Sequence, residues 1–475
     1  MNNRRKRKVV FHIPTIGVGR AAPRVPQLGA SGRNMQFTRL VGIAGVIALL
    51  IGTASSTLRS TPTSITPRRR ADTTLTHDPI ARLQARLDAG ELTLPHDSAS
   101  GYLAGVLRAL NIPVASQGLV FSRTSLQTDK IAPWAPRAIY FNDDVYIGFV
   151  QGSHFLEVAA VDPTSGAVFY TLSQEPRARP TFSRETTTCL MCHQSRAATG
   201  GVPGFMVLST LADRYGYPIT GVHEGTTSDW TPMAERFGGW YVTGTNGTTG
   251  HSGNVYSPML GHEVSDKRAY KAQFKFQRES ARTDLAGKFD ATPYLSAHSD
   301  LVALLVLVHQ TGVHNLITAV HEAAKEALLE RSLSVDSTLP MIATDSTVIT
   351  NVHLRGAVER LARSMLFAGE AKLDAPITGT TSFAADFPKQ GPHDAQGRSL
   401  REFDLTRRLF KYPLSFLIYS ESFNAIPAFA KRAVYRRMKV VLDGQDDDLD
   451  FQQLRESDRT AILAILRATK PDFPQ

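Results

Sequence analysis

The chain has 475 residues, which is enough for two or three domains, and 42% of them are hydrophobic, which is ample for a large core. The formal net charge of +10 first suggests a nucleic-acid partner, but nine Lys and Arg residues and no acidic residue precede residue 40. Subtracting these nine charges from +10 leaves +1 for the rest of the chain. A near-neutral body gives no reason to expect nucleic-acid binding.

Residues 1–54 have the composition of an export segment. The basic residues precede an apolar run over 40–54, which has the roughly 7 to 15 residues of a signal-peptide core rather than the roughly 20 of a bilayer span. Small residues around Ala54 suit cleavage there, and an uncleaved anchor in the inner membrane is the alternative. Both place the body outside the cytoplasm, in the periplasm or exported further. Residues 55–76 are rich in Ser, Thr, Pro and Arg and predict a flexible tether.

The rest of the chain, 77–475, is expected to form one large region. Helical patterns over 79–87 and 102–110 come first. A β-rich part over about 100–175 follows, in which four apolar runs are separated by Asn, Asp, Pro and Gly turns. These runs predict an antiparallel β-meander, with strands at Ala138–Phe141, Val145–Val150, Phe155–Val161 and Ala167–Leu172.

Directly after the meander, Cys189-Leu190-Met191-Cys192-His193 reads C-x-x-C-H, the attachment signature of a c-type haem. Two thiols one helical turn apart can add to the two vinyl groups on one edge of the porphyrin. The next residue, His193, can then reach the iron as its proximal ligand. The sequence contains no other cysteine. We therefore predict one covalent haem c with its iron, attached to Cys189 and Cys192 and ligated by His193.

Two other interpretations of the cysteine pair fit the sequence less well. A zinc site needs about four ligands and usually a second Cys or His pair at matching spacing, and no such pair is present. A thioredoxin-like dithiol is expected at a strand-to-helix turn of a βαβ unit. Here the residues before the motif, 184–188, have a loop composition and no βαβ pattern surrounds them.

Residues 176–270 form a loop-rich segment around the motif, with much Gly and Thr. Its aromatic stretch 237–247 either lines the porphyrin or supplies core aromatics to an ordinary turn. We predict His251 as the distal ligand, because the glycines beside it allow a close approach to the haem. The segment contains most candidates for the sixth iron ligand, namely Met206, His223, Met233, His251, Met259 and His262.

The C-terminal half, about 295–475, has mainly helical patterns. A helix over 299–330 has Ser299 as its expected N-cap, and its three histidines are expected to be core or hydrogen-bonded residues rather than metal ligands. The acidic stretch 443–450 is interpreted as a solvated loop between helices rather than a calcium site. Further helices are predicted over 354–368, 427–442 and 458–468, the second with Pro427 at its first position. The expected fold class is α+β, with a β-meander before the haem segment and a helical half after it.

Several stretches together resemble a group of large, exported bacterial proteins that carry a single c-type haem motif and are described as cytochrome c domain-containing. This resemblance implies covalent haem at Cys189 and Cys192 with His193 on the iron, and it implies no particular reaction. The group tends to have a histidine where this chain has Asn246. The resembling stretches are PRAIYFNDDVYIGF (136–149), CLMCH (189–193), GGWYVTGTNG (238–247), SDLVALLVLVHQ (299–310) and RRLFKYPLSFLIYSESF (407–423).

Two classes of function are consistent with this sequence. In the first, the protein is an electron carrier or redox subunit that docks a periplasmic or membrane redox partner. In the second, it is a haem enzyme or gas sensor whose open distal site takes peroxide, oxygen or nitric oxide. The sequence alone leaves open whether the protein is an enzyme. It predicts contact with the membrane only through the N-terminal segment, if that segment is not cleaved.

Overall fold

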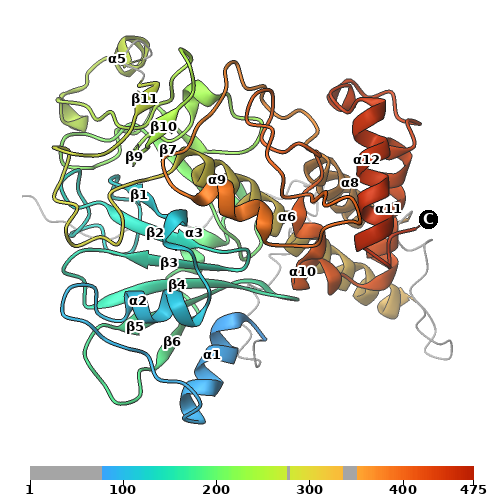
Figure 1. The fold of residues 1–475 in the computed structure, drawn as a ribbon, viewed down its shortest axis with the longest axis horizontal. Coiled ribbons are helices and arrows are strands. Elements are labelled where there is room, and N and C mark those ends of the chain that lie inside the picture. The colour runs from blue at the N-terminus through green and yellow to red at the C-terminus, as the bar shows by residue number, and fades with distance from the viewer. Residues whose placement is uncertain (1–76, 275–278, 335–349, 475) are drawn as a thin grey trace, which may run out of the picture. The chain divides into compact units, whose positions relative to one another are not determined.

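A seven-stranded antiparallel sheet organises the N-terminal half of the protein (Figure 1). The computed structural model describes residues 77–274, 279–334 and 350–474, so the predicted export segment and tether lie outside the described residues. The strand order is β6-β5-β4-β3-β2-β1-β9. The strands are β1 (Gly118–Val120), β2 (Arg137–Phe141), β3 (Val145–Phe149), β4 (Phe155–Asp162), β5 (Gly166–Ser173), β6 (Phe182–Glu185) and β9 (Trp240–Tyr241).

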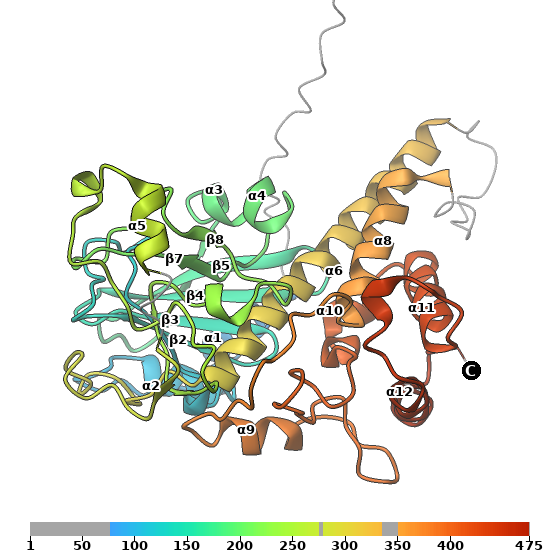
Figure 2. The same ribbon diagram turned by 90° about the horizontal axis from the view of Figure 1, so that it is seen from above.

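Side chains alternate between the two faces of this sheet, as the period of a β-strand requires. On one face, Tyr140, Ile147 and Val158 pack under the two N-terminal helices, α1 (Pro79–Asp88) and α2 (Leu103–Ala109). The hydroxyl of Tyr170 donates to Asp78, the N-cap of α1, and so fixes this helix on the sheet. Figure 2 shows α1 and α2 on one side of the sheet, and on the other side α3 (Leu190–His193) and α4 (Arg196–Thr199).

Helix α6 (Leu301–Ser334) is the central helix of the second face. By length and composition alone residues 301–330 could cross a membrane, but 89% of the most apolar stretch is buried inside the protein, as expected of a core helix. Asp300 caps this helix, because its side chain accepts the N–H groups of Val302 and Ala303. The prediction that Ser299 is the N-cap was therefore wrong. Its hydroxyl instead donates to the carbonyl oxygen of Tyr241 and accepts the N–H of Leu119.

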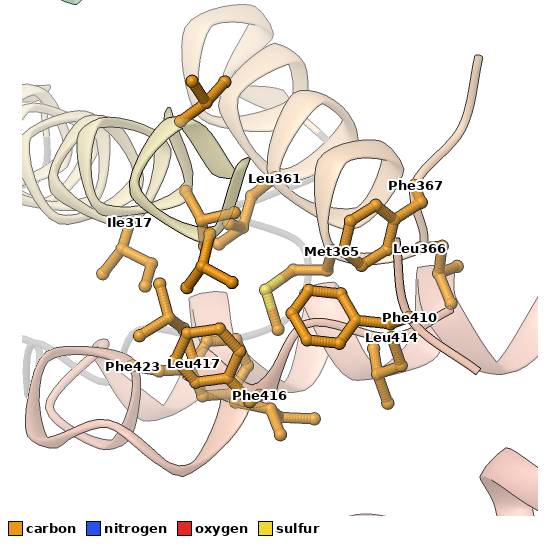
Figure 3. Close-up of a cluster of buried hydrophobic side chains, with 14 of the residues drawn as sticks. Ile317, Leu361, Met365, Leu366, Phe367, Phe410, Leu414, Phe416, Leu417 and Phe423 are labelled. Carbon is orange, nitrogen blue, oxygen red and sulfur yellow. The ribbon is translucent and has the colours of Figure 1, made fainter. Parts of the chain in front are cut away.

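The C-terminal helices pack against α6 through a dense apolar cluster (Figure 3). In this cluster, Leu361 and Met365 of α8 (Val352–Met365) pack against Ile317 of α6 and against the aromatic side chains of the 410–423 segment. Pro427 is the N-cap of α11 rather than its first residue, because its extended backbone (ψ 132°) precedes the first helical turn. The helices are α8 (Val352–Met365), α9 (Phe383–Asp386), α10 (Glu421–Asn424), α11 (Ala428–Leu442) and α12 (Glu456–Thr469).

Short elements occupy the loop-rich middle of the chain. Besides α3, α4 and β9, the described residues there form two two-stranded sheets, a short α-helix and the 3-10 turns Met233–Glu235 and Gly261–Glu263. These elements are β7 (Leu208–Thr210) with β8 (Glu224–Thr226), β10 (Gly244–Thr245) with β11 (Ala281–Arg282), and α5 (Lys267–Phe274). The α+β class, with a meander followed by a mainly helical part, is thereby confirmed.

Candidate haem attachment site

The C-x-x-C-H segment forms a single helical turn at the edge strand of the large sheet. Strand β6 ends at Glu185, and Cys189 begins the turn with helical backbone angles (φ −65°, ψ −39°). The N–H groups of Cys192 and His193 both donate to the carbonyl oxygen of Cys189, at 3.3 and 2.9 Å. The two cysteines therefore lie one turn apart, as predicted. Both are free thiols, Cys189 half-buried and Cys192 exposed.

The imidazole of His193 is held in one orientation. Its Nδ1 lies 2.9 Å from the carbonyl oxygen of Gly204, and because a carbonyl can only accept, Nδ1 must carry the hydrogen. The other nitrogen, Nε2, then has the free lone pair, and no described residue makes a hydrogen bond to it. Burial lowers the pKa of His193, which favours the neutral imidazole. Its ring packs on Phe169 of β5, with 4.6 Å between the centroids.

Helix α6 in turn fixes the backbone that holds His193. The side-chain amide of Asn315 accepts the N–H of Phe205 at 2.8 Å and donates to the carbonyl oxygen of Phe205 at 2.7 Å. A Cβ atom at position 204 would collide with Oδ1 of Asn315, so this close approach requires glycine. The core helix and the motif are thus connected through Gly204 and Phe205.

Charged side chains of the sheet lie near the motif. Arg137 and Glu157 form an ion pair at 2.6 Å, with 20% and 18% of their side chains exposed. Burial raises the pKa of the Cys189 thiol to about 11, with further contributions from Glu185 and Glu157. Reactive dithiols need a thiol pKa below its usual range, so this environment does not suit Cys189 to thioredoxin-like chemistry.

A pocket of about 430 Å³ lies over β4, β5 and β6, and the residue of its lining nearest to the motif in the chain is Glu185. It begins at Glu185, whose carboxylate accepts the hydroxyl of Thr171 at 3.3 Å. From there it continues along β5 to Ser173 and is also lined by Phe155 and His154 from the start of β4. This pocket could not be predicted from local patterns, because its wall is assembled by strand pairing.

His251, the predicted distal ligand, is buried elsewhere in the loop-rich segment. Its N–H donates to the carbonyl oxygen of Glu279, and its Nδ1 accepts the N–H of Gly253 at 3.1 Å. Burial lowers the pKa of His251 to about 4, so the ring is neutral near pH 7 and its hydrogen is on Nε2. None of these contacts involves the C-x-x-C-H segment, and His251 as a ligand stays a prediction.

The other predicted candidates lie in different environments. His223 is hydrogen-bonded to the hydroxyl of Ser209, and Met233 is buried in the core, whereas Met259 and His262 are exposed. Trp240 and Tyr241 are also core residues, on β9 at the opposite end of the sheet from β6, which favours the core interpretation of the 237–247 stretch. Of the described residues, no group of three or more His, Cys, Asp or Glu is arranged to hold a metal ion.

The three histidines of α6 are hydrogen-bonded core residues, as predicted. His314 and His321 bond to the carbonyl oxygens of Asp143 and Ser422. His309 lies between two side chains, with Nδ1 at 2.9 Å from Asp229 and Nε2 at 2.8 Å from the hydroxyl of Ser415.

The order Asp229, His309, Ser415 has the connectivity of a hydrolase triad, and sequence reasoning missed it because the three residues are far apart in the chain. Ser415 has no exposed surface, and its hydroxyl also accepts the N–H of Leu417. The His309 ring is stacked on Phe367, with 4.2 Å between the centroids. A substrate has no access to a hydroxyl enclosed in this way, so we assign these residues a structural role.

The comparisons with known proteins add no relative. No protein-family model, no curated protein and no solved structure matches this chain. Its function is therefore inferred from the chemistry of the residues described above.

Proposed function

We propose that this protein is an exported c-type haem protein, with one haem covalently attached to Cys189 and Cys192 and its iron on His193. The observation that carries the proposal is the hydrogen bond from Nδ1 of His193 to the carbonyl oxygen of Gly204. Histidines that bind a metal usually donate the other ring N–H to such an acceptor, which fixes the tautomer and the ring orientation. The residues present therefore fit the group that the motif implies.

The thiols also suit attachment. Cys192 is exposed and Cys189 is half-buried, so both can be reached by the vinyl groups of an incoming porphyrin. The apolar side chain of Met191, between them, is 75% exposed. The attachment edge of the haem would thus lie at the protein surface, where a periplasmic or membrane redox partner can approach it.

When bound, the haem iron supplies one-electron redox chemistry. The chain's own residues orient the imidazole, exclude water from its Nδ1 side and set the local charge through Arg137 and Glu157. Electron transfer is the function that we favour. A haem enzyme or gas sensor for peroxide, oxygen or nitric oxide is the second candidate, and the pocket that Glu185 lines, four residues before Cys189, is the observation in its favour.

The test is haem staining after denaturing electrophoresis, on protein produced together with a c-haem maturation system. The wild-type chain is expected to retain its stain, and a Cys189→Ala/Cys192→Ala variant is expected to lose it. Stain that survives in the double variant would contradict the proposal, as would a wild-type chain that never acquires haem. Localisation is tested separately, by recovering the stained chain from the periplasmic or membrane fraction.

A further inference from the structure

Strand register determines the floor of the pocket over β4, β5 and β6. Thr171 of β5 lies opposite Ser183 of β6, and Ser173 of β5 lies opposite Phe155 of β4. Paired residues, and residues two apart on one strand, point to the same face, so these four side chains share a face with Glu185. Paired strands are rigid elements, and they hold these side chains in place before any ligand binds.

Hydroxyl groups are the commonest polar groups of this lining. The hydroxyl of Thr171 donates to the carboxylate of Glu185 at 3.3 Å, and the hydroxyl of Ser173 accepts the N–H of Glu175 at 3.3 Å. Because each hydroxyl can both donate and accept, the floor offers both kinds of hydrogen bond to a ligand. The four hydroxyls that line the pocket belong to Thr171, Ser173, Thr181 and Ser183.

The charged residues of the lining balance one another. Arg177 supplies N–H donors and Glu185 supplies acceptors, so the two carry opposite charges. Arg177 also pairs with Glu175 at 3.0 Å, and its charge is therefore compensated without a ligand. The lining has no excess positive charge with which to attract an anion. Phe155 adds an aromatic side chain against which C–H groups can pack.

A ligand that matches this lining carries hydroxyls around its edge and C–H groups on its faces. Cyclic sugars have this structure. The volume of about 430 Å³ lies within the range of about 300 to 1,000 Å³ that is usual for small-molecule sites. A porphyrin matches less well, because its faces are wide and apolar whereas the lining is largely polar.

We propose that this pocket binds a neutral mono- or disaccharide, whose hydroxyls bond to Thr171, Ser183 and Glu185 and whose ring packs on Phe155. Sugar binding is a function beyond electron transfer. It does not rest on the proposed haem, because the lining of the pocket does not include the two cysteines of the motif or its histidine.

The test is isothermal titration calorimetry on the full-length protein. Glucose, galactose, maltose and cellobiose are the neutral ligands, and glucuronate and galacturonate are the ionised counterparts of the first two. At least one neutral sugar should bind saturably, and each uronate should bind more weakly than its neutral counterpart, because Glu185 repels a carboxylate. Glu185→Gln should weaken binding of the neutral sugar about tenfold, as expected for the loss of one charge-assisted hydrogen bond. It should also reduce the discrimination against the uronate.

A blocking variant locates the site. Ser183→Tyr puts a large side chain into the pocket at an exposed position of β6, and it should abolish sugar binding. The matched control is Ser98→Tyr, also at an exposed position but outside the pocket, which should bind as the wild type does. Equal binding in Ser183→Tyr and the wild type would overturn the inference, as would a wild type that binds none of these sugars. A uronate bound more tightly than its neutral counterpart would refute the neutral class of ligand.

Discussion

His193 and Gly204 are joined in both directions: the N–H of Gly204 donates to the carbonyl oxygen of His193 at 2.8 Å, and Nδ1 of His193 donates back at 2.9 Å. This pair determines which ring nitrogen can face a metal. It depends on a glycine at position 204, because Asn315 of α6 occupies the space that a Cβ atom would need.

Gly204→Ala is therefore expected to disturb the site. Overpacking of this kind typically costs about 1–3 kcal/mol of folding free energy. Here it should also displace the carbonyl that orients His193. We expect covalent haem to remain, because the cysteines are unchanged, but with a weakened His193–iron bond, visible as a shift towards high-spin iron. The matched control is Gly225→Ala, where a Cβ atom meets nothing within 4 Å. Equal spectra for both variants would contradict this account.

Glu157→Gln tests the charges near the site. The carboxylate of Glu157 and the guanidinium of Arg137 both act on His193, with opposite signs. Removing the carboxylate leaves the positive charge of Arg137 unbalanced, which disfavours ferric iron relative to ferrous iron. The reduction potential should therefore rise, as measured by redox titration of the haem bands. Glu91→Gln, at an exposed position after α1, should leave it unchanged, and a lower potential in Glu157→Gln would be inconsistent with this charge arrangement.

Ser415→Ala tests the structural role of the Asp229–His309–Ser415 chain. The variant leaves Nε2 of the buried His309 without its partner, and an unsatisfied buried polar group costs about 1–3 kcal/mol. Urea denaturation should show a loss of stability of this size, with an unchanged haem spectrum. Ser98→Ala, at an exposed position, is the control. Hydrolytic activity in the wild type that disappears in Ser415→Ala would show that the structural assignment is wrong.

Glu370→Gln tests the pH dependence of stability. Burial, followed by the charge of Asp229, raises the pKa of Glu370 to about 7. Because its folded-state pKa is above the unfolded value of about 4.5, Glu370 is protonated in the folded state between these pH values and ionised in the unfolded chain. The wild type therefore loses stability from this group as the pH rises from about 4.5 to 7. The glutamine variant avoids this loss.

The free energies of unfolding of the wild type and Glu370→Gln should thus be similar near pH 4.5, and the variant should gain relative to the wild type up to about pH 7. Asp144→Asn should likewise gain stability relative to the wild type as the pH rises, since burial and the charge of Asp143 also raise the pKa of Asp144 to about 7. A difference that does not vary with pH would mean that Glu370 ionises as readily when folded as when unfolded.

Features encoded within a few residues could be predicted from the sequence. The apolar runs between turns predicted the strands β2 to β5. The C-x-x-C-H spacing predicted that the two cysteines lie one helical turn apart, with the histidine next to the second cysteine. Helix α6 was predicted from its helical pattern, and His309 and Gln310, which interrupt its apolar residues, indicated a core helix rather than a membrane span; the His309 ring and the amide nitrogen of Gln310 are hydrogen-bonded in the core.

Features that depend on distant partners could not be predicted. Strand β9 has only two residues and exists because it pairs with β1, more than a hundred residues earlier. The pocket and the position of His154 depend on the register of β4, β5 and β6. The cap of α6 is Asp300 rather than Ser299 because Ser299 is engaged by β1 and β9, which a local pattern does not show.

The most direct test of the central claim is the pyridine haemochrome spectrum of the purified, denatured protein. Pyridine replaces both axial ligands, so the position of the reduced band reports only how many vinyl groups have become thioethers. We predict the spectrum of a haem with two thioether bonds, changing to that of a single bond in Cys189→Ala or Cys192→Ala. A spectrum with both vinyl groups intact, or haem that is extracted by acidified organic solvent, would contradict covalent attachment at these cysteines.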